Sequence, residues 1–228
     1  MPNTTETPFK YILFDLDETL YPREAGIMKA LSERMHQFMV HKLGLPADDV
    51  PTKRRYFYRK YGTTLRGLME EHRIAPADYL AYVHNINLHN FIAASPPLNQ
   101  MLAEIPFAKA IFTNADTAHA ERVLNVLQVR PHFDFIIDIT TMNYKNKPDP
   151  LAYQQALNML GVSGEECIMV EDTPRNLLPA KDAGMTTILV DGQSSPSLGI
   201  DYVVPTVFHV GHIVKSLLPM GDNGSTIL

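Results

Sequence analysis

The chain has little cysteine and no long apolar run, and it carries no excess of basic residues. Cys167 is the single cysteine among 228 residues, which excludes an internal disulfide. Because Cys167 begins an apolar stretch, we expect a buried small hydrophobic side chain and not a reactive thiol. No apolar segment approaches the roughly 20 residues that a membrane-spanning helix needs. The net charge of −5 argues against binding to nucleic acid polymers, which usually requires a basic face.

Other features of the composition indicate a soluble protein with a substantial core. Residues 1–8 lack a basic segment followed by an apolar one, so no signal peptide is predicted. Hydrophobic residues make up 45% of the chain, enough for one large domain or for a core with a smaller insert. We therefore expect a cytoplasmic protein without a membrane partner, and its oligomeric state stays open.

Short apolar segments recur along the chain and predict the strands of one sheet. Loops and helix-like patterns separate most of them, and strands that alternate with helices form parallel βαβ units. The sequence therefore predicts an α/β fold with a doubly wound, Rossmann-like parallel sheet. The predicted strands are 11–14, 108–112, 133–137, 168–170, 186–190 and 202–204.

The long interval 22–97 interrupts this alternation. It contains helix-like stretches and no convincing strand, whereas a single crossover needs only about a dozen residues. We predict that it forms an inserted, all-helical cap on an α/β core made of residues 8–21 and 98–219. Residues 220–228 are predicted to be a disordered tail. The predicted cap helices are 28–43, 52–61, 64–72 and 76–87.

Two aspartates, Asp15 and Asp17, follow the first predicted strand directly. Residues two apart on a strand share a side, and open α/β sheets bind ligands at the carboxyl ends of their strands. Two carboxylates in one crevice repel each other unless a cation or a shared proton offsets the repulsion. The pair therefore predicts a divalent metal site.

Polar groups of complementary chemistry follow the later strands: Thr113, Asn114, Lys147, Glu171 and Asp172. Carboxylates combined with a hydroxyl and a lysine suit phosphoryl transfer, which depends on positioning and on charge neutralisation. An aspartate nucleophile can form an acyl-phosphate and so divide hydrolysis into two easier steps. A ligand set made only of oxygen atoms favours Mg²⁺.

Taken in order, these motifs resemble the haloacid dehalogenase superfamily of phosphatases. The chain is most similar to the pyrimidine 5′-nucleotidase-like branch of that superfamily, and the resemblance covers residues 9–190. The superfamily motifs are Asp15-Leu-Asp17-Glu-Thr19, Thr113, Lys147-Pro148 and Glu171-Asp172. The branch is indicated by the sequences at 17–21, 105–116, 119–120 and 143–148, and by 61–68 and 82–84 in the insert.

The resemblance implies catalytic and metal-binding roles for the acidic residues. Asp15 would attack phosphorus and also bind Mg²⁺. Asp17 would protonate the leaving oxygen and then activate water, while its backbone carbonyl binds the metal. Asp172 would supply a further carboxylate to Mg²⁺. Glu171 stands where many relatives carry aspartate, so we expect it to act on the metal through a water molecule.

The resemblance also implies how the substrate is held. Thr113, Asn114 and Lys147 would bind the oxygens of the transferring phosphoryl group, and the cap would close over the site and exclude water. Arg66 and His84 in the cap are the candidates for contact with the leaving group, and each has a structural role as its alternative.

The predicted function is therefore a Mg²⁺-dependent phosphomonoesterase that forms an aspartyl-phosphate. The predicted substrate is a small phosphorylated metabolite, a nucleoside 5′-monophosphate with pyrimidines preferred. Sugar phosphates, phosphoglycolate and pyridoxal phosphate stay open as substrates, as does a phosphomutase reaction, because fold does not fix function. Two other classes also stay open, namely a phosphoacceptor signalling module resembling response-regulator receivers and a non-catalytic binding protein.

Overall fold

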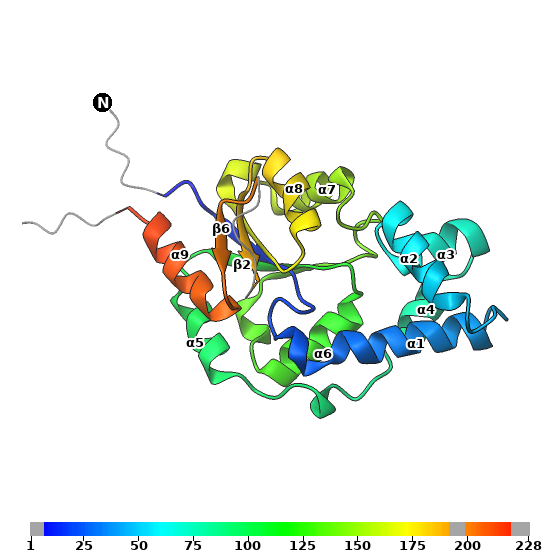
Figure 1. The fold of residues 1–228 in the computed structure, drawn as a ribbon. Helices are drawn as coiled ribbons and strands as arrows, with labels where there is room; N and C mark the ends of the chain where they lie inside the picture. Colours follow the sequence, from blue (N-terminus) through cyan, green and yellow to red (C-terminus); the bar gives the residue numbers. More distant parts are fainter. Residues whose placement is uncertain (1–6, 192–198, 220–228) are drawn as a thin grey trace, which may run out of the picture.

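The computed structural model describes residues 7–191 and 199–219, and its centre is a six-stranded sheet (Figure 1). All neighbouring strands are parallel, in the order β3-β2-β1-β4-β5-β6. The tail predicted at 220–228 lies outside the described residues. The strands are β1 (Tyr11–Phe14), β2 (Ala108–Phe112), β3 (Phe135–Ile137), β4 (Cys167–Glu171), β5 (Thr186–Val190) and β6 (Tyr202–Val204).

Helices cover both faces of the sheet, as continuous apolar strands require. Along β1, Ile12 and Phe14 pack into one buried cluster and Leu13 into the other. The first face is covered by α5 (Pro96–Glu104), α6 (Thr117–Leu127) and α9 (Val210–Leu217). The second is covered by α7 (Pro150–Leu160) and α8 (Pro174–Asp182). This arrangement confirms the predicted doubly wound α/β fold.

Four helices lie between β1 and α5, at one side of the sheet (Figure 1). The described chain from 22 to 97 contains no strand, in agreement with the helical pattern of its sequence. Its assignment as a separate cap stays a prediction. The helices are α1 (Ile27–His41), α2 (Val50–Tyr61), α3 (Thr64–His72) and α4 (Pro76–Val83). Two short 3₁₀ helices, Arg23–Ala25 and Leu88–Asn90, lie in the same interval, and three more in the described chain are Arg130–His132, Gly164–Glu166 and Val207–His209.

The turn between α2 and α3 shows how the local sequence places these two helices. Gly62 ends α2 with φ +87°, a left-handed conformation that glycine adopts at no steric cost. Thr63 then caps α3, because its hydroxyl accepts a hydrogen bond of 3.1 Å from the main-chain N–H of Arg66. The turn also contacts the core, since the Asn146 side chain donates to the carbonyl of Tyr61 at 3.2 Å.

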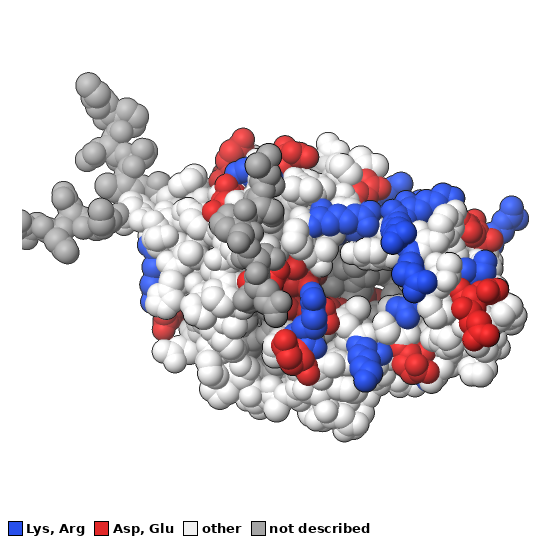
Figure 2. Space-filling model, in the orientation of Figure 1, with Lys and Arg blue, Asp and Glu red and all other residues white. Residues whose placement is uncertain are grey.

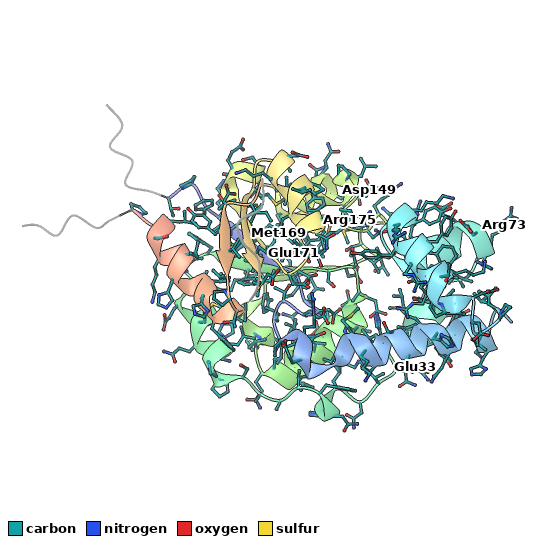
Figure 3. The ribbon with its side chains drawn as sticks, in the orientation of Figure 1. Glu33, Arg73, Asp149, Met169, Glu171 and Arg175 are labelled. Carbon is teal, nitrogen blue, oxygen red and sulfur yellow. The ribbon has the colours of Figure 1, made fainter. Side chains whose placement is uncertain are left out.

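Helix α8 makes a second contact between the core and the four helices. Arg175 donates to the main-chain carbonyl of Tyr58 at 3.1 Å, and its guanidinium lies 5.3 Å from the centre of the Tyr58 ring. Figure 3 shows Arg175 on the side of α8 that is directed toward α2. The aromatic face of Tyr58 attracts the cation, so this contact helps to hold α2 against the core.

The strand order reverses direction at β1, and this reversal positions the site. The chain runs outward from β1 through β2 to β3, and β4 then returns to pair with the other side of β1. The carboxyl end of β1 is therefore the switch point at which open α/β sheets form a ligand crevice. Among the described residues, the structure has no helix of the length and hydropathy that crossing a membrane requires.

Candidate active site

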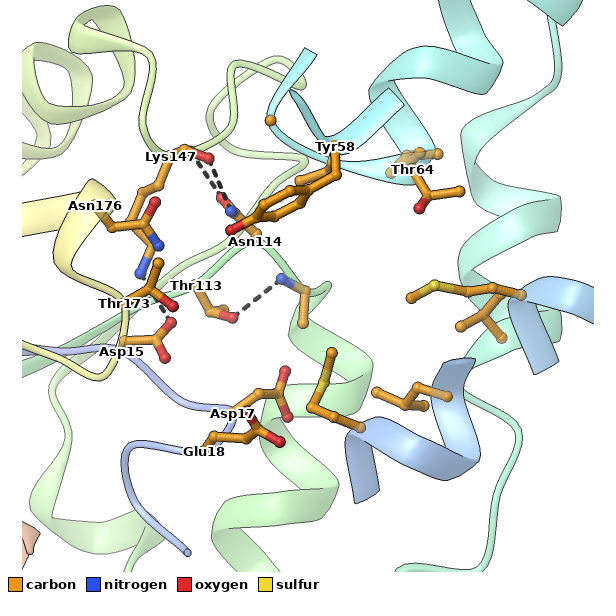
Figure 4. Close-up of a pocket in the computed structure, with 18 of the residues that line it drawn as sticks. Asp15, Asp17, Glu18, Tyr58, Thr64, Thr113, Asn114, Lys147, Thr173 and Asn176 are labelled. Carbon is orange, nitrogen blue, oxygen red and sulfur yellow. Dashed lines mark hydrogen bonds and ion pairs between the residues drawn. The ribbon is translucent and has the colours of Figure 1, made fainter. Parts of the chain in front are cut away.

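Asp15 continues the line of β1 and is nearly buried, with 7% of its surface exposed. Its main-chain N–H donates to the carbonyl of Val170 at 2.9 Å, and the Thr19 hydroxyl donates to its Oδ2 at 3.0 Å. Glu18 turns the chain with φ +64°, in the left-handed region. These contacts fix one carboxylate at the floor of the crevice, where Figure 4 shows Asp15 and Asp17 at the edge of a shared space.

Lys147 is the counter-charge at this floor and is 1% exposed. Its Nζ lies 2.8 Å from Oδ1 of Asp15 and 2.6 Å from Oε2 of Glu171. Burial lowers the pKa of Lys147, but the two carboxylates outweigh that effect and the net shift is upward. The lysine is therefore held as a cation, directed at the carboxylate that was predicted to be the nucleophile.

Three carboxylates, those of Asp15, Glu171 and Asp172, lie together with ligand atoms within 4.8 Å of one another. Burial raises the pKa of Asp15 to about 6; Lys147 opposes the shift, and the charge of Asp172 adds to it. A divalent cation would relieve this excess of negative charge, and hard oxygen ligands suit Mg²⁺. The donor set therefore fits the predicted metal. The Asp17 side chain is not part of this group, and metal binding by its backbone carbonyl stays a prediction.

Glu171 is the last residue of β4 and is buried, and its Oε2 lies 2.6 Å from Nζ of Lys147. Its second oxygen, Oε1, accepts a hydrogen bond of 3.3 Å from the N–H of Thr173. Burial raises its pKa well above the ordinary value, and Lys147 opposes the shift. Both oxygens of Glu171 already contact protein donors, an arrangement that is compatible with a metal contact through water.

Asp172, which follows Glu171, has partners of its own. Arg23 donates to its Oδ2 at 3.2 Å and to Oε2 of Glu18 at 3.0 Å. Arg23 stands at the beginning of the interval after β1, so it joins the first turn of that interval to a predicted metal ligand. No local sequence pattern indicates this contact, whose partners are 149 residues apart.

Thr113 and Asn114 follow β2, as the sequence predicted, but their side chains do different things. The Thr113 side chain is 1% exposed, and its oxygen accepts from the N–H of Ala115 at 3.0 Å. Asn114 accepts from the N–H of Lys147 at 2.8 Å and donates to its carbonyl at 3.0 Å (Figure 4). The Asn114 side chain thus fixes the loop that carries Lys147.

Asp17 lies outside this group of three carboxylates and has partners of its own. Its Oδ1 contacts the Tyr21 hydroxyl at 2.5 Å and Nε2 of His119 at 2.9 Å. Burial raises the pKa of Asp17, but the interactions with His119 and Tyr21 outweigh it and lower the pKa to about 2. Tyr21 and His119 fall within the segments 17–21 and 119–120, and the sequence alone indicated no role for either side chain. The i, i+4 spacing of Asp17 and Tyr21 was the available signal.

A cavity of about 270 Å³ joins this floor to the helical interval. Its core wall includes Asp15, Asp17, Thr113, Lys147 and Asp172. Its other wall is made by apolar and polar side chains of α1 to α4 and of the residue that follows α4, among them Met28, Leu31, Met35, Arg54, Tyr58, Thr64, Leu65, Tyr79, Leu80, Val83 and His84. Figure 2 shows a hollow on this face with basic side chains along its edge and acidic ones nearby.

The two cap residues proposed from sequence lie in different places. His84 lines the cavity, where its Nδ1 lies 3.1 Å from Oδ1 of Asp116. Arg66 is absent from the cavity lining and lies in a neighbouring depression, 2.6 Å from Glu70 and 3.4 Å from the carbonyl of Tyr144. The geometry therefore favours the structural role for Arg66. Arg54, which the sequence did not single out, is the arginine that lines the cavity.

A family model for haloacid dehalogenase-like hydrolases matches residues 9–184. The chain belongs to this family, which confirms the resemblance seen in the ordered motifs. The pyrimidine 5′-nucleotidase-like branch stays a prediction.

Individual relatives are distant. Phosphate metabolism protein 8 of Saccharomyces cerevisiae is 23% identical over 198 residues, which are 79% of this chain and 61% of that protein. Beta-phosphoglucomutase of Bacillus subtilis is 38% identical over 90 residues, 40% of this chain and 39% of that protein. The matches cover less than two thirds of either relative. The HAD phosphatase from Thermococcus onnurineus superposes with a TM-score of 0.59 at 20% identity, over 90% of this chain and 98% of that one, which shows a shared fold.

Proposed function

We propose that the protein is a Mg²⁺-dependent phosphomonoesterase acting in the cytoplasm on small phosphorylated metabolites. The observation that carries this proposal is the contact between Asp15 and Lys147, 2.8 Å apart at the floor of a cavity and beside two further carboxylates. A nucleophilic carboxylate, a fixed cation and a group of hard oxygen ligands are the components that phosphoryl transfer requires.

In the proposed first step, an oxygen of Asp15 attacks phosphorus and the bond from phosphorus to the leaving oxygen breaks. Lys147 and the main chain at 113–114 hold the phosphoryl oxygens, and Asp17 gives its proton to the leaving oxygen. Mg²⁺ held by Asp15 and Asp172 would neutralise charge on the phosphoryl group. A bound phosphate ester also places negative charge near Asp17, which raises its pKa toward the protonated form that this step needs.

In the proposed second step, Asp17 accepts a proton from a water molecule, and the water oxygen attacks the aspartyl-phosphate. The bond between phosphorus and Asp15 breaks, which releases inorganic phosphate and regenerates the carboxylate. A single carboxyl group thus acts as the acid and then as the base.

We propose nucleoside 5′-monophosphates, with pyrimidines preferred, as the substrates. The cavity size suits one small molecule and not a polymer. Its cap wall combines apolar side chains and Tyr58 with two buried donors, Nε of Arg54 and the Tyr79 hydroxyl, which have no hydrogen-bond partner among the described residues. Unpaired buried donors favour a ligand that brings acceptors, and the carbonyl oxygens of a flat pyrimidine base are such acceptors.

Phosphate release from a panel of monoesters tests the reaction and the substrate together. We expect release with Mg²⁺ to be at least about 100-fold faster than with EDTA. We expect kcat/KM for UMP and CMP to exceed that for sugar phosphates, phosphoglycolate and pyridoxal phosphate by about tenfold. Highest activity on another ester would support the proposed phosphomonoesterase reaction and contradict the proposed nucleotide substrate. If no ester released phosphate in a Mg²⁺-dependent way, the phosphatase hypothesis would be wrong, and the signalling or binding alternatives would be favoured.

The similarity to a beta-phosphoglucomutase makes a phosphomutase the second candidate. The panel separates the two, because a mutase converts one sugar phosphate into an isomer and releases little inorganic phosphate. Product analysis with a hexose 1-phosphate, in the presence of a catalytic amount of the bisphosphate, would show the isomer.

Two arginines of the cap provide a matched test of leaving-group contact. We expect Arg54→Ala to lower kcat/KM for UMP by about 10- to 100-fold, because it removes a donor from the cavity wall. Its effect on 4-nitrophenyl phosphate, which offers no pyrimidine carbonyl, should be several-fold smaller. Arg66→Ala should change both values by less than about twofold, since Arg66 lies outside the cavity.

Arg54 also supports the fold, since it donates to the carbonyl and hydroxyl oxygens of Ser32 at 3.0 and 2.9 Å. Tyr79→Phe is therefore measured beside it, because this change removes one hydroxyl and keeps the packing. An equal loss on both substrates in Arg54→Ala, together with no loss on UMP in Tyr79→Phe, would show that this wall does not select the leaving group.

A further inference from the structure

The two oxygens of the Asp17 carboxylate have unequal surroundings. Oδ1 contacts two groups, the Tyr21 hydroxyl at 2.5 Å and Nε2 of His119 at 2.9 Å. Oδ2 accepts no hydrogen bond from the residues that the structure describes. Because Asp17 lines the cavity, one oxygen is anchored in the protein while the other stays available to a substrate.

His119 is fixed by its own neighbours. It lies in the first turn of α6, is completely buried, and its main-chain N–H donates to Oδ1 of Asp116 at 2.8 Å. Its ring stacks on that of His84 with centroids 4.3 Å apart and planes 22° from parallel. His84 in turn contacts the same Asp116 oxygen at 3.1 Å. The imidazole therefore has little freedom to move away from Asp17.

The hydrogen bonds of the His119 imidazole indicate that the residue does more than fill space beside Asp17. Nδ1 of His119 is buried and has no hydrogen-bond partner among the described residues. An apolar side chain at this position would avoid the cost of burying an unpaired ring nitrogen. Asp17 is the one hydrogen-bond partner of the ring in the described structure, so the polar function of the ring is directed at Asp17.

We propose that His119 is a positioning residue for acid–base catalysis. It holds Oδ1 of Asp17, with Tyr21, so that Oδ2 is the oxygen that transfers the proton. In the first step the proton on Oδ2 moves to the leaving oxygen as its bond to phosphorus breaks. In the second, Oδ2 takes a proton from the attacking water. The inference rests on the proposed phosphomonoesterase activity, and efficient proton transfer needs this geometry to be fixed before the substrate reacts.

A comparison of leaving groups tests the proposal with two similar replacements. Asparagine at this position is too short to reach Asp17, whereas the side-chain amide nitrogen of glutamine falls near the place of Nε2. For an alkyl phosphate, whose leaving oxygen needs a proton, we expect His119→Asn to lower kcat/KM about 100-fold. His119→Gln should recover most of that loss. The KM values should change little.

An aryl phosphate separates positioning from folding. Nitrophenolate leaves without help from an acid, so His119→Asn should still form the aspartyl-phosphate of 4-nitrophenyl phosphate at a rate within a few-fold of the wild type. Its second step needs Asp17 as the base, so a burst of about one equivalent of nitrophenolate should precede slow turnover. Loss of folded protein would instead lower kcat/KM for both substrates by the same factor and would give no burst.

Combination with Asp17→Asn provides the control. If His119 acts through Asp17, adding His119→Asn to Asp17→Asn should lower the activity by less than a further factor of about two. If the two residues acted independently, the fold losses of the two single variants would multiply. Tyr21→Phe, which removes the other donor and keeps the ring, should show the same preference for the aryl ester. If His119→Asn and Tyr21→Phe each lowered kcat/KM for the alkyl and the aryl ester by the same factor, the proposal would be wrong. An inactive wild type would reject the phosphomonoesterase function itself, which is a separate outcome.

Discussion

Asp15→Asn is expected to reduce phosphate release by at least about 10⁴-fold, because an amide cannot serve as the attacking group. The side chain is the right probe, since it lies 2.8 Å from Lys147 and belongs to the group of carboxylates at the cavity floor. Asparagine has nearly the same size and can still accept from the Thr19 hydroxyl. The measurement is phosphate release from the best substrate of the panel, at saturating Mg²⁺.

The fold is expected to survive this change. The amide carries no charge, so it removes the cost of burying a charge, which is the main reason that the pKa of Asp15 is raised to about 6, and it also removes the smaller repulsion from Asp172. Against this, Lys147 loses one of its two ion-pair partners and keeps Glu171. We expect thermal unfolding to stay within about 5 °C of the wild type. Residual turnover that copurifies with a purified Asp15→Asn protein and requires Mg²⁺ would contradict the covalent mechanism.

Lys147→Met is expected to lower the free energy of unfolding by about 3–5 kcal/mol, as breaking a buried ion pair from one side usually does. Methionine has a similar length, so little packing is lost, but Asp15 and Glu171 are left in a buried site without their cation. The activity should fall together with the stability, because the same ammonium group is proposed to hold the phosphoryl oxygens. Chemical denaturation of the metal-free protein measures the stability, and single-turnover kinetics measure the chemistry.

Lys145 provides the matched control, two residues away and partly exposed. Lys145→Met should change the free energy of unfolding by less than about 1 kcal/mol, as surface substitutions usually do. In the double variant Lys147→Met with Glu171→Gln, part of the lost stability should return, since one uncompensated carboxylate is removed. If Lys147→Met and Lys145→Met were equally stable, the buried ion pairs would not contribute in the way proposed.

The architecture could be predicted from the sequence because each strand is a short, largely apolar run, and β1 to β5 each have a polar residue at or directly after their end. All six predicted strands are present, although β3 begins at Phe135 and not at 133. Phe133 directly follows a 3₁₀ helix and does not belong to the strand. Its side chain is apolar and buried, so it resembled a strand residue in the sequence. Helix α4 ends at Val83, before the predicted 87, and neither α5 nor α7 was predicted.

The central residues of the site could be predicted because they follow the carboxyl ends of the strands. Asp15, Thr113, Lys147 and Asp172 come from loops at the carboxyl edge of the sheet, and the cavity brings them together. Contacts that depend on tertiary packing had no comparable signal. Asp17 and His119 are 102 residues apart in sequence, and no local pattern predicts that they meet.

Arg66 illustrates the converse. A motif drew attention to it, yet its place on α3 directs it toward Glu70 and the loop at Tyr144, whereas Arg54 on α2 lines the cavity. Nothing in one sequence distinguishes two arginines on neighbouring helices until the rotation of each helix against the core is known.

The two walls of the cavity have different origins in the chain. The reacting groups come from loops scattered between residues 15 and 172, whereas the opposite wall is drawn from one continuous stretch, between Met28 and His84. A single exchange of that stretch between related genes could therefore replace the whole leaving-group wall and leave the reacting groups as they are. Such a chain can acquire a new substrate by recombination at two points, without a sequence of dispersed substitutions that each disturb the chemistry.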